Sequence, residues 1–247
     1  LVWFESPQDP RDVSAWTKHV ISSECNDGWT MGIYAADMDA DGDTDVLWTT
    51  RKGTHGGVRW LENPGIGDAQ RNPWTSHLIS STYDNYMFGG LGDVDGDGLV
   101  DVVAPIREKA VVKFYRRLSA DGLRWEEYDI ATGYTLNIKG AAVGDVDLDG
   151  HNDVVVTLLY GRPEAAWYSH DGDALSGQWV RTAMSDAQGK TDAPVLLDLD
   201  RDGDLDMATT IESGPQAVWF ENPTPSGTVA AAHLSAGATL PAQLRRI

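Results

Sequence analysis

Residues 93–101 read DVDGDGLVD, and the same pattern returns as DMDADGDTD at 37–45, DVDLDGHND at 145–153 and DLDRDGDLD at 198–206. Each stretch carries aspartate at positions 1, 3, 5 and 9 and glycine at position 6. Carboxylates at this spacing converge on one point, and the glycine permits the sharp turn between them. Several hard oxygen ligands in flexible geometry suit calcium, so the pattern predicts about four structural Ca²⁺ sites, one per loop.

Two further positions refine the expected ligand set. Position 7 varies between the loops, as expected if only its main-chain carbonyl coordinates the ion. Position 12, which is glutamate in an EF-hand, holds Trp48, Ala104, Val156 or Thr209, so an EF-hand is excluded. The predicted metal-ligating residues are Asp37, Asp39, Asp41, Asp43, Asp45, Asp93, Asp95, Asp97, Leu99, Asp101, Asp145, Asp147, Asp149, His151, Asp153, Asp198, Asp200, Asp202, Asp204 and Asp206.

The loops recur with periods of 56, 52 and 53 residues, and two other motifs keep the same phase. One is an aromatic segment (VWFESP from Val2, VRWLENP from Val58, AAWYSHD from Ala165, VWFENP from Val218). The other is a Trp-x-x-polar-x-apolar stretch that starts at Trp16, Trp74, Trp125 and Trp179. Each period holds four short strand candidates between turn residues, which is typical of a β-propeller blade. A stack of unrelated hairpins is the alternative.

The expected fold is therefore all-β, with about four to five blades of four antiparallel strands and one DxDxDGxxD loop per blade. We expect the propeller to cover residues 1–223, with repeats starting near residues 31, 87, 139 and 192. Residues 2–22 read as the last two strands of a blade and would complete the last repeat by pairing the two termini. A fragment, or a homo-oligomer that completes the ring, is the alternative. Residues 224–247 match no part of the repeat and are expected to form a loose tail or a weak helix.

The composition restricts the classes of partner and the cellular location that we expect for this chain. The formal net charge is -19, and 18 of the 38 acidic residues lie in the four loops. This charge argues against nucleic acid or an anionic membrane surface as a partner. No apolar run approaches the roughly 18 residues of a membrane span, so no membrane insertion is expected. The chain has no signal peptide and a single cysteine, Cys25; we expect a mature or truncated extracellular protein, because calcium outside cells fills weak oxygen-ligand sites.

The loops and their flanking strand motifs resemble the FG-GAP/VCBS repeat family, which includes the propellers of integrin α-chains and many secreted bacterial and fungal proteins. The resemblance covers roughly residues 1–223. It implies that each loop binds calcium at a blade corner, where the ion clamps the first strand to the second and does no chemistry. The family contains lectins, adhesion proteins, polysaccharide lyases and sugar dehydratases, so the fold alone does not select a function.

The loops on the face opposite the calcium corners are expected to frame the mouth of the central channel. Seven of the 19 basic residues fall there. The predicted ligand-binding residues are Arg51, Lys52, Arg107, Lys109, Arg162 and Trp29. Guanidinium groups pair with carboxylates and phosphates, which favours an anionic glycan or another small anionic ligand. Tryptophans that recur in every blade are expected to pack between sheets, whereas Trp29 and Trp48 break the repeat and are ligand candidates.

Catalysis is less well indicated, since neither GxSxG nor HExxH occurs. Candidates for proton transfer are His55, Lys139, Lys190, Tyr86 and Tyr134. Three functions remain open: a module that binds an anionic glycan, a lyase or hydrolase of anionic sugars or phosphate esters, and an adhesion or scaffold fragment. The rim loops differ between blades, which favours one asymmetric site. We favour the binding module.

Overall fold

The computed structural model describes residues 1–24, 28–80, 84–131, 137–159, 165–184, 190–212, 216–223 and 244–246. Within these residues the secondary structure is β throughout, apart from the short 3-10 helix η1 (Asp68–Arg71). The strands form four four-stranded antiparallel sheets and one two-stranded sheet. The sheets are the blades of a β-propeller, which confirms the predicted fold class. None of the helical residues described forms a segment long and apolar enough to span a membrane.

Each blade uses four strands in chain order. Blade 1 contains β3 (Trp29–Ala36), β4 (Asp45–Arg51), β5 (Gly57–Glu62) and β6 (Thr75–Leu78). Blade 2 contains β7 (Gly90–Gly92), β8 (Asp101–Ile106), β9 (Val111–Arg117) and β10 (Trp125–Ala131). Blade 3 contains β11 (Ile138–Gly144), β12 (Asp153–Leu158), β13 (Ala165–Ser169) and β14 (Val180–Ala183). Blade 4 contains β15 (Val195–Leu197), β16 (Asp206–Ile211), β17 (Gln216–Phe220) and β18 (Leu244–Arg246).

The core lies between the blades, because successive side chains of a strand point to opposite faces of its sheet. On β8, Val103 belongs to the apolar cluster shared with blade 3, whereas Val102 and Ala104 belong to the cluster shared with blade 1. The second strands β8 and β12 are accordingly buried along their whole length. A third cluster joins blades 3 and 4, and a fourth joins blade 1 to the N-terminal hairpin. Each blade is thus stabilised by its neighbours.

Neighbouring blades approach most closely near their first strands, where small residues are required. A Cβ added at Gly140 would lie 2.4 Å from Pro194 Cδ of blade 4, and one added at Gly90 would lie 2.9 Å from Ala142 Cα of blade 3. Both distances are shorter than any ordinary carbon contact, so these positions exclude a larger residue. Backbone hydrogen bonds between Phe88 and β11 join blades 2 and 3 at the same level.

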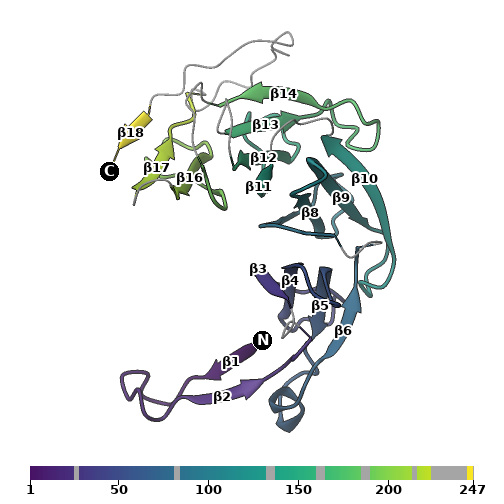
Figure 1. Cartoon of the computed structure of the whole chain (residues 1–247), viewed down its shortest axis with the longest axis vertical. Coiled ribbons are helices and arrows are strands. Elements are labelled where there is room, and N and C mark those ends of the chain that lie inside the picture. The colour runs from purple at the N-terminus through teal and green to yellow at the C-terminus, as the bar shows by residue number, and fades with distance from the viewer. Residues whose placement is uncertain are drawn as a thin grey trace.

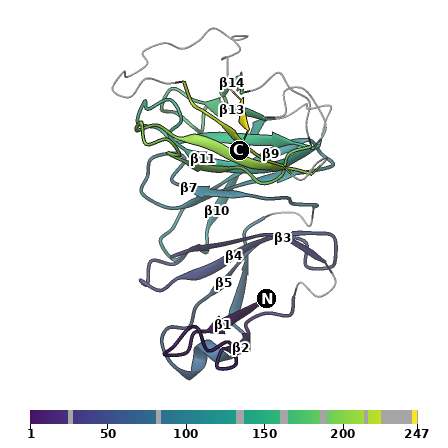
Figure 2. The same cartoon turned by 90° about the vertical axis from the view of Figure 1, so that its left-hand side faces the viewer.

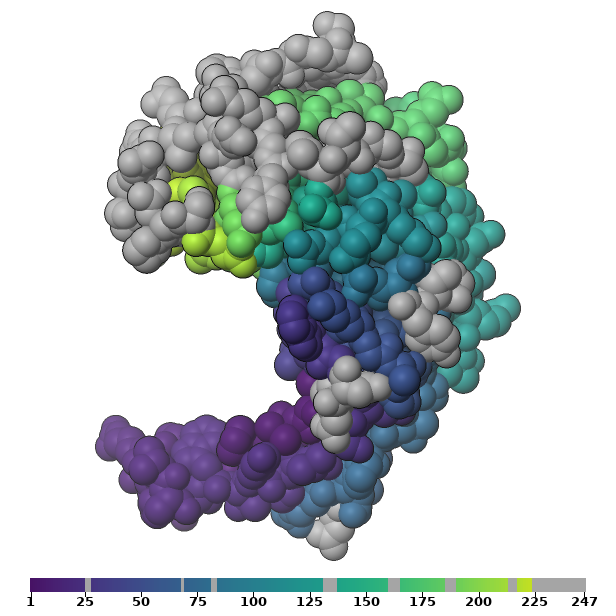
Figure 3. Space-filling model, in the orientation of Figure 1, coloured from purple at the N-terminus to yellow at the C-terminus, as the bar shows by residue number. Residues whose placement is uncertain are grey.

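The blades form an open arc with the first strands on its concave side, and its two ends do not meet (Figures 1 and 3). In the side view, the N-terminal hairpin and blade 1 lie at one end of the long axis, whereas strands of blades 3 and 4 lie at the same height (Figure 2). The N-terminal hairpin, β1 (Val2–Glu5) and β2 (Thr17–Val20), lies at one end and forms a sheet of its own. Blade 4 lies at the other end.

The outer strand of blade 4 differs from the sequence-based expectation. The strand near Trp16 was expected beside β17, but β2 pairs with β1, and β17 pairs with β18 through Val218–Arg246 and Phe220–Leu244. Residues 244–246 therefore contribute a strand where the sequence pattern indicated none. A three-residue outer strand is held mainly by backbone pairing on one side, so it leaves little side-chain pattern to detect.

Candidate metal loops and cationic rim

Each aspartate loop connects the first strand of a blade to the second and is shaped by its own carboxylates. The aspartate at position 1 accepts the backbone N–H of the glycine at position 6, over 3.1 Å in loop 37–45 and 2.9 Å in loop 93–101. The aspartate at position 5 accepts the N–H of position 7 in all four loops. The position-6 glycines have φ between 88° and 102°, which a side chain rarely tolerates. The repeated pattern therefore specifies one loop shape.

These loops bring the predicted carboxylates together. In each loop, oxygen atoms of three aspartates lie within 4.8 Å of one another: Asp37, Asp39 and Asp41; Asp93, Asp95 and Asp101; Asp145, Asp147 and Asp153; Asp198, Asp200 and Asp206. The Oδ1 atoms of Asp37, Asp93 and Asp153 are buried and accept no hydrogen bond from the described residues. A cation can satisfy a buried carboxylate oxygen in that state. The four clusters therefore fit metal ions.

The aspartate at position 9 also ties the loop to the third strand of its blade. Asp45 accepts the N–H groups of Met38 and Asn63, both over 2.7 Å, and Asp101 accepts those of Val94 and Arg117 over 2.9 and 2.8 Å. Both aspartates are fully buried. Burial raises the pKa of Asp45 to about 6 and that of Asp101 to about 7.

In loop 145–153 the pKa of the aspartate at position 9 is raised further than in the first two loops. Burial, followed by the charge of Asp147, raises the pKa of Asp153 to about 9. Asp153 accepts the N–H of Val146 over 2.9 Å, but its Oδ1 lacks the second backbone donor that Asp45 and Asp101 have. A bound cation would favour the charged form of such carboxylates and lower their pKa.

Side chains of each following blade reach the preceding loop. The Arg117 guanidinium donates to the carbonyl of Asp37 over 3.4 Å. The Asn152 amide donates to the carbonyl of Asp93, and the Asn222 amide donates to that of Val146, each over 2.7 Å. The loops are therefore connected to one another along one edge of the propeller.

At the opposite edge, four of the predicted ligand-binding residues gather where β3 and β4 of blade 1 meet the β8–β9 turn of blade 2. Trp29 is 56% exposed, and the Lys52 Nζ and Arg51 Cζ atoms lie 4.4 and 5.0 Å from its ring centroid. The N–H groups of Lys52 and Arg107 bond to the side chain and the carbonyl of Asn85, over 3.0 and 3.1 Å. Asn85 thus holds the two basic loops side by side.

The charges in this cluster are poorly compensated. Burial, and next the charge of Arg107, lower the pKa of Arg51, while Glu108 acts in the opposite direction and has a smaller effect. The Arg51 Nε atom is buried without a hydrogen-bond acceptor among the described residues. Within the same residues, the side chains of Arg51, Lys52 and Arg107 form no ion pair with a carboxylate. We call Trp29, Arg51, Lys52 and Arg107 the cationic rim.

Two further predicted residues fall outside this cluster. The Lys109 Nζ atom pairs with Asp84 Oδ2 over 2.7 Å, so its charge is compensated. Arg162 lies outside the described residues, as does Tyr134.

The comparisons with known proteins agree with the loop geometry. A family model described as the FG-GAP-like repeat matches residues 37–104 and 145–209, together more than half of the chain. The chain belongs to the FG-GAP-like repeat family. This confirms the resemblance that the loops and strand motifs indicated. No curated protein matches the chain.

Among solved structures, the propeller is similar to a lectin from Agrocybe aegerita that was described for its specific recognition of non-reducing terminal N-acetylglucosamine. The TM-score is 0.51 at 15% sequence identity, and the match covers 78% of this chain and 49% of the lectin chain. At this identity the likeness shows the fold alone. The FG-GAP-like chain spans about half the length of that lectin.

Among the described candidates for proton transfer in this FG-GAP-like propeller, Lys139 and Lys190 lie together, whereas Tyr86 and His55 lie elsewhere. Lys139 and Lys190 belong to an ion-pair cluster between blades 3 and 4: Lys139 pairs with Asp192 and Glu212, and Lys190 pairs with Glu212. Hydrogen bonds from the two lysines lower the pKa of Glu212. Each of these ammonium groups is thus engaged by a carboxylate of the protein itself.

The other two described candidates are an internal tyrosine and a turn histidine. Tyr86 is fully buried, and its hydroxyl bonds to that of Tyr115. His55 lies in the turn between β4 and β5, where its Nδ1 is 3.1 Å from the Thr54 hydroxyl.

The tryptophans divide differently from the prediction. Trp48 is fully buried against Ile21 and Leu61, so it is not available to a ligand. It lies on β4 and faces the N-terminal hairpin, a long-range contact that repeat spacing does not reveal. Trp60, one of the recurring tryptophans, is also buried and stacks on His77, with ring centroids 4.4 Å apart. Trp29 alone of the two non-repeating tryptophans is exposed.

Proposed function

We propose that this FG-GAP-like chain is an extracellular, calcium-stabilised propeller that binds an anionic carbohydrate, a uronate-containing or sulfated glycan, at the cationic rim. The observation that carries the proposal is the exposed Trp29 ring flanked by Arg51 and Lys52, next to Arg107. In a chain of net charge -19, Arg51 and Lys52 at the ring and Arg107 beside them form no ion pair with a carboxylate of the described residues, so they make a local site of the opposite sign.

The chemistry of the rim suits such a ligand. A guanidinium pairs with a carboxylate or a sulfate through two parallel N–H donors, and the exposed aromatic face offers an apolar surface for a sugar ring. An anion at this point would also reduce the repulsion between Arg51 and Arg107 and accept from the buried Arg51 Nε. The lectin from Agrocybe aegerita shows that a similar fold can carry a carbohydrate site, which is compatible with this ligand class.

Calcium is the ion that we assign to the aspartate loops. Their donors are all oxygens, and carboxylates spaced along a flexible loop match its coordination better than that of smaller divalent ions. Sites of this kind fill at the calcium concentrations found outside cells, which supports an extracellular location.

A binding panel tests the rim. Polyuronates, sulfated glycans and neutral glycans are offered to the wild type and to the Arg51→Gln/Arg107→Gln variant in saturating calcium. Charge-assisted hydrogen bonds contribute about 1.5–3 kcal/mol each, so the variant should lose at least about tenfold in affinity for the anionic glycans. The control, Lys18→Gln/Arg124→Gln, makes the same change in charge at two exposed residues away from the rim.

The outcomes separate the possible functions. An equal loss in the control would show that net charge, and not the rim, attracts the ligand. Binding only to neutral glycans would contradict the proposal. Release of shortened or unsaturated sugars by the wild type would replace the binding function with a hydrolase or lyase.

A further inference from the structure

One residue beside each aspartate loop differs in charge between the blades. Cross-strand pairs place Leu61, Tyr115, Tyr168 and Phe220 at the same position in the four blades, opposite Val46, Val102, Val154 and Met207. The residue that follows this position, next to the loop, is Glu62 in blade 1, Arg116 in blade 2, Ser169 in blade 3 and Glu221 in blade 4. Only blade 2 has a cation there.

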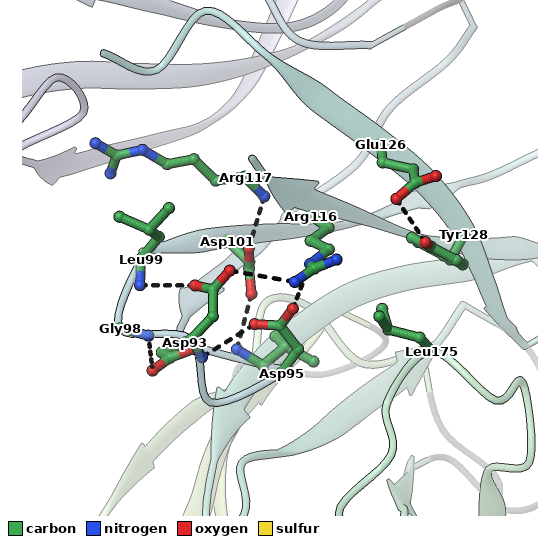
Figure 4. Close-up of polar contacts among 12 residues, drawn as sticks. Asp93, Asp95, Gly98, Leu99, Asp101, Arg116, Arg117, Glu126, Tyr128 and Leu175 are labelled. Atoms are coloured by element: carbon green, nitrogen blue, oxygen red, sulfur yellow. Dashed lines mark hydrogen bonds and ion pairs between the residues drawn. The ribbon is translucent and has the colours of Figure 1, made fainter. Parts of the chain in front are cut away.

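Arg116 reaches directly into its loop. Its Nε pairs with Asp95 Oδ2, and its Nη2 lies 3.4 Å from Asp97 Oδ2. Figure 4 shows the Arg116 guanidinium directed at the loop and in contact with the Asp95 carboxylate. The Asp95 side chain is only 5% exposed. The guanidinium thus neutralises the aspartates at positions 3 and 5, both predicted metal ligands.

In blades 1 and 4 the same position adds negative charge instead. Loop 37–45 carries five aspartates with Glu62 beside it, and loop 198–206 carries five with Glu221 beside it. These two loops also have aspartate at position 7, whereas loop 93–101 has Leu99 there. The second loop therefore has the weakest negative field of the four.

We propose that the loop of blade 2 is closed by Arg116 in place of a calcium ion, so that three of the four loops bind metal. A guanidinium and a divalent cation repel each other at this range, and Arg116 already holds two of the carboxylates that the ion would need. Loop 93–101 would then keep its shape without metal. This inference rests on the proposed calcium sites.

The test counts bound ions on the full chain by equilibrium dialysis against calcium, followed by elemental analysis. Wild type should bind three. Arg116→Ser gives blade 2 the residue that blade 3 has naturally, and the count should rise to four. Adding Asp93→Asn to that variant should return the count to three, which places the fourth ion in loop 93–101. In the opposite direction, Ser169→Arg should reduce the wild-type count to two.

The results distinguish this inference from the function on which it rests. A wild type that binds no calcium overturns both. A wild type that binds four ions, or an Arg116→Ser variant that still binds three, overturns the inference and leaves the calcium sites standing. Because Ser169→Arg changes a partly exposed residue in a different blade, it keeps the test decisive if Arg116→Ser does not fold.

Discussion

The loop edge and the cationic rim of this propeller are built on different rules. Along the loop edge, the blades repeat the same hydrogen bonds: glycine to position 1, position 7 to position 5, and position 2 to position 9. At the rim, Arg51 of blade 1 has a counterpart in Arg107 of blade 2, but the positions equivalent to Trp29 hold Asn85, Asn137 and Lys190, so the exposed ring occurs in blade 1 alone. The repeated hydrogen bonds stabilise every blade in the same way. A residue that occurs in one blade alone is therefore a better candidate for ligand binding.

The two regions also treat charge differently. The loops concentrate carboxylates, and several of their buried oxygens accept no hydrogen bond from the described residues, so cations would complete their pairing. The rim concentrates cations in an acidic chain without internal partners among the described residues. Perturbing the first region should therefore change stability, and perturbing the second should change binding.

Calcium removal should produce the largest effect. An ion that binds only the folded chain contributes about 2.7 kcal/mol at a hundredfold excess over its Kd, and independent sites add. Excess chelator should lower the melting temperature of the wild type steeply, because several buried carboxylates lose their counter-charge together. Circular dichroism during heating measures the shift, and renewed calcium should reverse it. An unchanged transition would show that the loops do not stabilise the fold through metal.

The buried Asp45 should give the next largest effect. Asp45→Ala leaves the N–H groups of Met38 and Asn63 without an acceptor, and each buried donor left unpaired costs about 1–3 kcal/mol. Asp45→Asn keeps one carbonyl oxygen, so its loss should be smaller. Urea unfolding measures both variants, and because Asp45 is also a predicted metal ligand, it is carried out with calcium and with chelator. Equal losses for the two variants would mean that the backbone hydrogen bonds contribute little.

The loops and the blades could be predicted because short stretches of consecutive residues specify them. Nine consecutive residues specify each loop, and a period of slightly more than 50 residues recurs whatever the chain does elsewhere. The clustering of Trp29, Arg51, Lys52 and Arg107 was also foreseen, since propeller topology places these turns on one face. Long-range packing could not be predicted in this way, and for this reason Trp48 and Tyr86 are buried although the sequence placed them among the functional candidates.

The position of Arg116 beside its loop could not be predicted from the sequence, for a different reason. It lies in VKFYRR, the one aromatic segment that lacks the tryptophan of its counterparts, so its alignment with Glu62 and Glu221 depends on strand register. Once the cross-strand pairs are known, Arg116 of blade 2 aligns with the glutamates of blades 1 and 4, Glu62 and Glu221. The outer strand β18 is a similar case, because only its backbone pairing with β17 identifies it.

The smallest change in stability is expected at the rim. There, replacement of an exposed tryptophan can be compared with replacement of a tryptophan buried between two blades. Trp60→Ala removes a buried ring from between blades 1 and 2 and should cost about 3–5 kcal/mol. Trp29→Ala removes an exposed ring and should change the free energy of unfolding by no more than about 0.5 kcal/mol. Urea unfolding measures both variants.

If Trp29→Ala destabilised the chain as much as Trp60→Ala, the Trp29 ring would be part of the packing between blades, and its pairing with Arg51 and Lys52 would have a structural purpose. A stable Trp29→Ala variant that no longer binds the anionic glycan would separate the two regions completely, with the repeated residues holding the fold and the unrepeated ring serving the ligand.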